Sequence, residues 1–383
     1  MYKRFTGLVL ISTFGLISPA NAVLPLSEIP TVMSEMVTSP KLNNPAIVLM
    51  DQATGQVIYE RSADSERKPA STLKLLSAVS AIDYLGAAKT FHTSLYKSDR
   101  RNEIVIVGES DPWIALTDKE AKDYQRVSRV QMAKEITKNA SGHNITLRYS
   151  GMYSTDMTNL RIQLNRMGKR VYIVKADQNS ALSHTSSEIK TFTSPNIQKI
   201  LEWTLLWSDN KLAERLARKA AVRAGFTPDP DGINSLFDSE LTKFGIGTER
   251  VNFVDGSGLD YENKLTAQVL SQLLFKISKD PHYQPILDGL PVGGLSGTMA
   301  ERFWKSAPNA VGLVRAKTGS LNGTVSMAGF VESGEHQYVF VAIADEIPRT
   351  NYAAKQARSY LDKMLGKIAE EQIPKVAPAT QSS

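Results

Sequence analysis

The chain has 383 residues, of which 42% are hydrophobic and 22% are charged, and this balance excludes a disordered or fibrous protein. It contains no cysteine, which excludes a thiol nucleophile, a zinc-thiolate site, an iron–sulfur cluster and disulfide bonds. The formal net charge is +6, or about +4 when Lys3 and Arg4 of the first 22 residues are left out, and this mild positive charge suits an anionic polymer as a partner. No run of Lys and Arg residues indicates that the protein binds nucleic acid.

Residues 1–22 have the three parts of a secretory signal peptide. Lys3 and Arg4 precede an apolar run from Phe5 to Ile17, and Ala20-Asn21-Ala22 is a small-residue cleavage pattern. The alternative is an uncleaved membrane anchor, but the apolar run is shorter than the roughly 20 residues that a membrane span needs. We therefore expect cleavage after Ala22 and an exported protein without a membrane span.

The next part of the chain mixes strands and helices. Apolar runs predict strands at 46–51, 56–61 and 102–114, and an amphipathic helix from Pro69 to Gly86 lies between the second and the third. From about residue 114 to residue 187 the sequence is mixed and polar, so this stretch looks inserted. Within it we expect one helix and two strands, at 129–140, 144–151 and 170–176.

Helices dominate from Ser194 onward. Ser194 is the expected N-cap of a first helix, the chain breaks at 208–210, and Thr266 is expected to cap a later helix. The remaining pattern predicts a second helix at 211–225, strands at 311–320, 324–332 and 337–345, and a closing helix at 352–371.

Strands at both ends with helices between them predict an α/β fold. One antiparallel sheet would be built from the N- and C-terminal segments and flanked by helices, with an all-helical subdomain and an inserted subdomain added. We expect the sheet domain to take 23–113, the insertion 114–187, and the helical subdomain with the rest of the sheet 188–370. Residues 371–383 are expected to form a disordered tail.

Lys74 lies on the apolar face of the predicted helix at 69–86, one turn after Ser71. Burial disfavours a charged ammonium and lowers its pKa, so a partly neutral Lys74 could take the proton of Ser71 and make it a nucleophile. The alternative is a lysine that extends to solvent beside a capping serine. Ser187 to Lys190 repeats the Ser-x-x-Lys spacing without an apolar helix.

Two further short motifs carry polar side chains. Ser208-Asp209-Asn210 lies at a break between two helices, where a hydroxyl and an amide can point into a cleft, or where they simply cap a helix. Lys317-Thr318-Gly319 lies on a predicted strand. There a Lys and a Thr can hold a carboxylate, and a glycine lets a substrate backbone approach closely. A solvated edge strand is the alternative.

The three motifs, in this order on a helix, a loop and a strand, form a joint signal. The sequence thereby resembles the serine penicillin-binding proteins and β-lactamases, and more closely the D-alanyl-D-alanine carboxypeptidase/endopeptidase family of low-molecular-weight class C penicillin-binding proteins. The segments "VGESDP", "VDGSGLDYENKLTAQVL", "LPVGGLSGTMAERF" and "AKTGSLNGTVSMAGFV" resemble that family's corresponding segments. The resemblance covers about 46–361 and implies a β-lactamase/transpeptidase-like fold.

The resemblance also implies a role for each motif residue. Ser71 would attack the carbonyl of the penultimate D-alanine of a peptidoglycan stem peptide, with Lys74 as base. Ser208 would relay a proton to the leaving amine, and Asn210 would orient Lys74 and bind the substrate amide. The terminal carboxylate would be bound by Lys317 and Thr318, and the backbone amides of Ser71 and Ser320 would form the oxyanion hole.

The same resemblance implies an exported enzyme associated with the cell wall, periplasmic or extracellular, without a cofactor. Its partners would be peptidoglycan stem peptides, with β-lactam antibiotics as covalent inhibitors. The insertion is shorter than in the family. Within it "GMYSTDMTN" resembles a family segment whose acidic residue contacts the stem peptide, although Met152 and Ser154 replace its tryptophans. Asp156 is therefore a candidate substrate contact, and a surface acid is the alternative.

Three other classes remain as alternatives. A β-lactamase would need a deacylating Glu, and the nearest match to its Glu-x-x-Leu-Asn loop, at 262–266, ends in Thr266 instead of Asn. A wall-binding module would keep the fold and lose turnover, but Ser71 and Lys74 are intact. A Ser-His-Asp hydrolase lacks a histidine in a suitable context, and no His-Glu-x-x-His spacing predicts a metal site.

Overall fold

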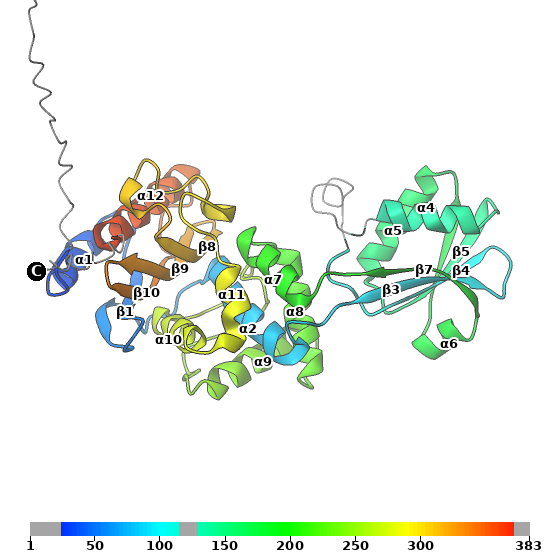
Figure 1. Ribbon diagram of the computed structural model, residues 1–383, viewed down its shortest axis with the longest axis horizontal. Helices are drawn as coiled ribbons and strands as arrows, with labels where there is room; N and C mark the ends of the chain where they lie inside the picture. The colour runs from blue at the N-terminus through cyan, green and yellow to red at the C-terminus, as the bar shows by residue number, and fades with distance from the viewer. Residues whose placement is uncertain (1–23, 115–126, 128, 371–383) are drawn as a thin grey trace, which may run out of the picture.

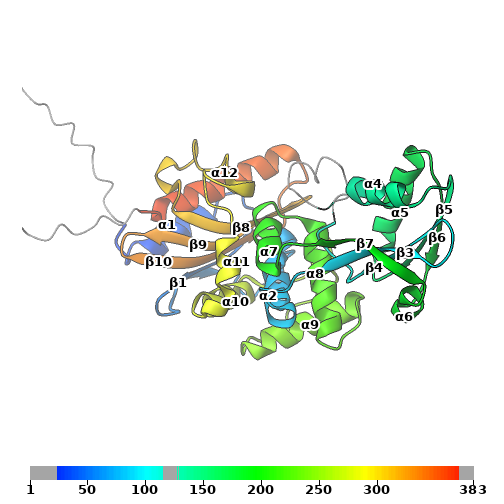
Figure 2. The same ribbon diagram turned by 45° about the vertical axis from the view of Figure 1, so that its right-hand side comes forward.

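The computed structural model describes residues 24–114, 127 and 129–370. The predicted signal peptide at 1–22 and the predicted tail at 371–383 lie outside the described residues. A larger lobe contains one sheet and most of the helices, and a smaller lobe with a second sheet projects from it (Figures 1 and 2). Within the described ranges, no helix is long and apolar enough to span a bilayer.

The main sheet joins the two ends of the chain, which confirms the predicted architecture. Its five antiparallel strands lie in the order β2-β1-β10-β9-β8, and Ala46 of β1 lies opposite Ile343 of β10. The strands are β1 (Ala46–Asp51), β2 (Val57–Arg61), β8 (Val314–Leu321), β9 (Thr324–Ser333) and β10 (His336–Ala344).

This sheet separates two hydrophobic cores because successive side chains of a strand point to opposite faces. Tyr338 and Phe340 of β10 join the core beneath α1 (Ile29–Val37) and α12 (Asn351–Ile368). Val339 and Val341 join the core beneath α2 (Lys74–Leu85) and α10 (Ala267–Ser278). Figure 2 shows α1 and α12 on one face of the sheet and α10 on the other.

The helical subdomain is built around α2, which packs against α7 (Ile197–Leu206), α8 (Asn210–Arg223) and α9 (Pro230–Lys243). The residues of α2 from Lys74 to Ile82 are all buried. In the neighbouring helix α7, the predicted N-cap Ser194 is wrong. Asn196 caps this helix, because its side chain accepts a hydrogen bond from Lys199 N. The prediction that Thr266 caps α10 is confirmed. The subdomain also contains α11 (Gln284–Asp288).

The second sheet has the strand order β6-β5-β4-β3-β7, in which β4, β5 and β6 are parallel. It begins at His92 and ends at Thr193, so it extends beyond the expected boundaries 114 and 187 at both ends, and we propose 92–193 as the inserted subdomain. Its elements are β3 (His92–Ser98), β4 (Glu103–Gly108), α4 (Arg129–Asn139), β5 (Asn144–Ser150), α5 (Ser154–Arg166), β6 (Arg170–Lys175), α6 (Gln178–Leu182) and β7 (Thr185–Thr193).

Candidate active site

The turn that carries Ser71 is held between two parts of the larger lobe. Residues Ala70–Leu73 form a short 3₁₀-helix that leads into α2, and Ala70 has a φ of 50°, in the left-handed region. The carbonyl oxygen of Pro69 accepts bonds from Thr72 Oγ1 and from Ser326 Oγ of β9, each at 2.7 Å. This strained turn is therefore fixed to the sheet, which is typical of functional sites.

Lys74 is buried, as its place on the apolar face predicts, with 1% of its surface exposed. Its Nζ lies 2.7 Å from Ser71 Oγ, 2.6 Å from Asn210 Oδ1 and 2.6 Å from the carbonyl oxygen of Ser257. An ammonium has three donors, so these three oxygens account for all of them. Burial lowers the pKa of Lys74 to about 7, against the opposing effect of Asp255.

Ser208 and Asn210 lie where α7 and α8 meet. The Asp209 side chain caps α8 by accepting from Leu212 N at 2.9 Å, so Asn210 is the first residue of that helix. Ser208 has a φ of 58°, which a non-glycine residue rarely adopts. The structure thus brings Asn210 to Lys74 and places Ser208 two residues before it on a strained turn.

Lys317 on β8 is fully buried, and its Nζ donates to the carbonyl oxygen of Thr318 at 2.8 Å. Burial holds the pKa of Lys317 well below its usual value, and the nearby charge of Lys74 adds to this effect. The hydroxyl of Thr318 is hydrogen-bonded to that of Thr298 at 2.8 Å. The Lys-Thr-Gly strand is therefore a wall of the site that holds Ser71 and Lys74, not a solvated edge.

The other two residues of this strand motif also have partners. A Cβ on Gly319 would lie 3.0 Å from Ser71 N and 2.1 Å from Ser326 Oγ, so the glycine lets β8 pack against the Ser71 turn. Ser320 Oγ accepts from Arg358 of α12 at 3.0 Å. Sequence reasoning missed Arg358, which no motif marks.

The loop that contains the "VDGSGLD" segment completes the site, although the sequence alone predicts no role for this segment. Its Asp255 carboxylate accepts bonds from the backbone amides of Ser257 and Gly258 at 3.0 and 2.6 Å and from two more amides beyond them. A Cβ on Gly258 would lie 1.9 Å from the carbonyl oxygen of Ala70, and its φ is 79°. Asp255 therefore shapes the loop that points the Ser257 carbonyl at Lys74.

Asp156 lies on α5 and is 5% exposed, so the alternative of a surface acid is wrong. Its Oδ2 accepts from Arg215 Nη2 of α8 at 2.8 Å, and its Oδ1 lies 3.5 Å from Lys211 Nζ. The Arg215 guanidinium also lies 3.8 Å from the centre of the Tyr153 ring. Asp156 thus attaches the inserted subdomain to α8, next to Asn210.

The side chains that the alternative enzyme classes would need do not lie together in the structure. None of the five histidines, all within the described residues, hydrogen-bonds a serine hydroxyl. Glu262 is exposed, and Asn263 beside it accepts from Val254 N at 2.8 Å, so this segment supports the Asp255 loop. In the described ranges, no three His, Asp or Glu side chains form a group that could hold a metal ion.

Comparison with known proteins identifies the family of this chain. The model of the family described as D-Ala-D-Ala carboxypeptidase 3 (S13) matches residues 31–147 and 129–368. The chain belongs to the S13 family. The resemblance inferred from the three motifs is thereby confirmed.

Curated relatives of this S13 protein include three carboxypeptidases. Carboxypeptidase Rv3627c of Mycobacterium tuberculosis is 24% identical over 385 residues, which cover 88% of this chain and 82% of the relative. Carboxypeptidase DacB of Mycolicibacterium smegmatis is 33% identical over 161 residues, or 41% of this chain and 34% of the relative. D-alanyl-D-alanine carboxypeptidase DacB of Haemophilus influenzae is 30% identical over 147 residues, or 38% and 31%. For the two DacB proteins, the matched segment spans only about a third of the length of the relative.

Solved structures show the same fold. Penicillin binding protein 4 (dacB) from Haemophilus influenzae superposes with a TM-score of 0.69 at 17% identity, covering 87% of this chain and 97% of that one. A predatory endopeptidase from Bdellovibrio bacteriovorus gives a TM-score of 0.59 at 16% identity, covering 86% and 94%. The predicted β-lactamase/transpeptidase-like α/β fold is confirmed.

Proposed function

We propose that this S13 protein is a penicillin-sensitive serine D,D-peptidase that acts on peptidoglycan stem peptides, as a D-alanyl-D-alanine carboxypeptidase, an endopeptidase or both. The observation that carries the proposal is the position of Lys74 Nζ, within 2.7 Å of Ser71 Oγ and bound to Asn210 and Ser257. A pKa of about 7 leaves a large part of Lys74 neutral near neutral pH, so it can accept the Ser71 proton.

The reaction would run through an acyl-enzyme. Ser71 Oγ loses its proton to Lys74 and attacks the carbonyl of the penultimate D-alanine. The backbone amides of Ser71 and Ser320 stabilise the negative oxygen of the tetrahedral intermediate. The peptide bond then breaks as Ser208 relays a proton to the leaving amine, and water hydrolyses the Ser71 ester, releasing the shortened peptide and the free enzyme.

The substrate's end would be bound by the β8 wall. Lys317 and Thr318 hold the terminal carboxylate of the substrate, Gly319 keeps the strand against Ser71, and Asn210 binds the substrate amide while it orients Lys74. A carboxylate beside Lys317 would restore the charge of that ammonium, because an opposite charge nearby favours the charged form. β-Lactams, which also present a carboxylate next to a reactive carbonyl, would acylate the same serine.

We place the enzyme outside the cytoplasm, periplasmic or extracellular and associated with the cell wall. The family assignment and the signal-peptide pattern at 1–22 support this location. A relative in the family fold, penicillin binding protein 4 from Haemophilus influenzae, has been solved in complex with a β-lactam, which supports β-lactams as covalent partners here.

Mass spectrometry after incubation with benzylpenicillin tests the proposal, with Ser71→Ala as control. We expect a long-lived adduct on Ser71 that the control lacks. In a separate assay on muropeptides, we expect release of D-alanine, cleavage of the peptide cross-links, or both. An adduct that forms and disappears within seconds would indicate a β-lactamase. No adduct on folded protein would indicate a wall-binding module without turnover.

A further inference from the structure

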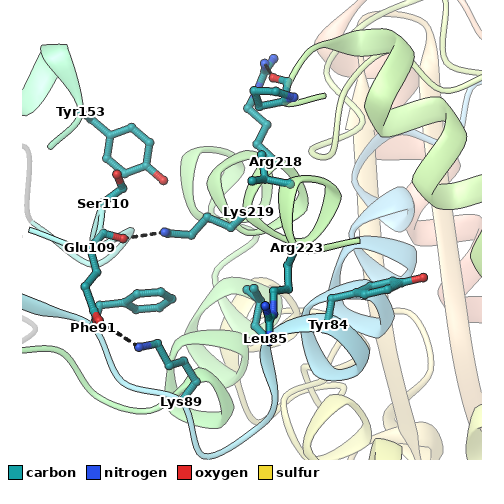
Figure 3. Close-up of a pocket in the computed structure, with 12 residues that line it drawn as sticks. Tyr84, Leu85, Lys89, Phe91, Glu109, Ser110, Tyr153, Arg218, Lys219 and Arg223 are labelled. Atoms are coloured by element: carbon teal, nitrogen blue, oxygen red, sulfur yellow. Dashed lines mark hydrogen bonds and ion pairs between the residues drawn. The ribbon is translucent and has the colours of Figure 1, made fainter. Parts of the chain in front are cut away.

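A second cavity lies apart from the Ser71 site, between the helical and the inserted subdomains. It has a volume of about 840 Å³, within the usual range for small-molecule sites. Figure 3 shows its two walls: Lys89, Phe91, Glu109 and Tyr153 lie on one side, and residues of α8 face them. Tyr84 and Leu85, at the end of α2, line it as well.

This cavity lies at the far ends of the two helices that carry catalytic candidates. Lys74 begins α2 and Tyr84 is ten residues later; Asn210 begins α8 and Lys219 is nine residues later. At 1.5 Å per residue, both helices rise about 14 to 15 Å from the Ser71 site to the cavity. The cavity is therefore not part of the site that binds the stem peptide in our proposal.

The cavity wall is strongly basic. Four lining residues, Lys89, Arg218, Lys219 and Arg223, are cationic, and one, Glu109, is anionic. The Glu109 carboxylate is bonded to Lys89 at 3.1 Å, and Arg218 is bonded to Glu214 at 2.6 Å, so these charges are largely matched. That leaves Lys219 and Arg223, which lie one helical turn apart.

Neither of these two cations forms an ion pair within the part of the chain that the structure describes. Lys219 Nζ donates to the main-chain carbonyl oxygen of Glu109 at 2.7 Å, which uses one of its three donors. The ammonium also lies 4.7 Å from the centre of the Phe91 ring. Burial lowers the pKa of Lys219 to about 8, against the opposing effect of the Asp111 and Glu109 carboxylates, neither of which forms an ion pair with it. A mostly buried ammonium without a bonded carboxylate is costly, and an anion in the cavity would lower that cost.

We propose that this cavity is a second ligand site, which binds an anionic group carried on a sugar or apolar body. The carboxylate or phosphate of the ligand lies between Lys219 and Arg223 and takes the free donors of both. Its body packs on the Leu85 and Val222 side chains, which line the cavity, and Val222 is exposed there. The proposal rests on the cavity itself and not on the reaction at Ser71.

Isothermal titration of the full chain tests this with three probes: N-acetylmuramic acid, which carries a carboxylate, glycerol 3-phosphate, and neutral N-acetylglucosamine. We expect saturable binding of at least one anionic probe, weaker at high salt, and none of the neutral sugar. The anion that binds more tightly identifies the ligand as a carboxylate or as a phosphate ester. Failure of both anions, or equal binding of the neutral sugar, would overturn the proposal.

Lys219→Met and Arg223→Gln should each weaken binding about tenfold or more, since each removes a charge-assisted hydrogen bond. Lys355→Met, which removes an exposed cation on α12, is the matched control and should bind as the natural protein does. All three variants should be acylated by benzylpenicillin at the natural rate, which shows that they are folded. If both single variants, Lys219→Met and Arg223→Gln, bound the anionic probe as tightly as the natural protein, the proposed site would be refuted.

Discussion

Gly319 packs directly against the turn that presents Ser71. The position a Cβ would take on Gly319 lies 3.0 Å from Ser71 N and 2.1 Å from Ser326 Oγ. Ser326 in turn donates to the carbonyl of Pro69 at 2.7 Å. A single missing methyl group thus sets the spacing between β8 and the proposed oxyanion hole.

We therefore expect Gly319→Ala to slow acylation by benzylpenicillin about 10²- to 10³-fold, which is the usual effect of losing one oxyanion donor. The rate is measured by stopped-flow or timed mass spectrometry. Gly168→Ala is the control, because Gly168 has a φ of 80° and open space around its Cβ position. It should cost about 1 kcal/mol of stability and leave acylation unchanged. Equal rates in the two variants would contradict the role of Gly319.

The proposed base should give acylation a specific pH dependence. Burial lowers the pKa of Lys74 to about 7, and only the neutral amine can accept a proton. We expect the acylation rate constant to rise with pH through about 7 and then to level off. Lys74→Arg should lower the rate about 10²- to 10⁴-fold and lose the inflection. A flat profile in the natural protein would show that another group is the base.

Asp156 should be more important for stability than for substrate binding. Asp156→Asn leaves Arg215 with one fewer anionic partner in a buried pair, and breaking such a pair costs about 3 kcal/mol. We expect a lower melting temperature with little change in KM for stem peptides that differ in the third residue. A normal melting temperature with a raised KM for one peptide would instead identify Asp156 as the substrate contact that the family resemblance implies.

A carboxylate far from Ser71 should make stability depend on pH. Glu240 of α9 is fully buried, and burial, then the neighbouring Asp83, raises its pKa to about 7. The native protein therefore holds a proton that the unfolded chain has lost, so stability falls as pH rises from about 4.5 to 7.

Glu240→Gln keeps the shape of this neutral side chain without the titration. We expect it to raise the free energy of unfolding by on the order of 1 kcal/mol at pH 8, with little effect at pH 5. Chemical denaturation at the two pH values measures this. The same gain at both would show that the proton on Glu240 is not the cause.

Hydrophobic periodicity predicts much of the fold. β1, β9 and β10 are almost wholly buried, so their continuous apolar runs identify them in the sequence. The helix that carries Lys74 has an equally clear apolar face. By contrast, β7 is mostly exposed and its sequence has no such pattern, so neither β7 nor its partner β3 is among the predicted strands. The bounds 92–193 for the inserted subdomain stay a proposal.

The sequence by itself determined the family, the order of the three motifs and the candidate nucleophile and base, because these depend on which side chains are present and how they are spaced. Only the tertiary structure decided that the third acceptor of Lys74 is the carbonyl of Ser257, 183 residues away. Every residue has such a carbonyl, so no residue type marks it. Likewise, only packing decided that Asp156 is buried against Arg215, since a charged residue in a polar stretch is otherwise expected at the surface.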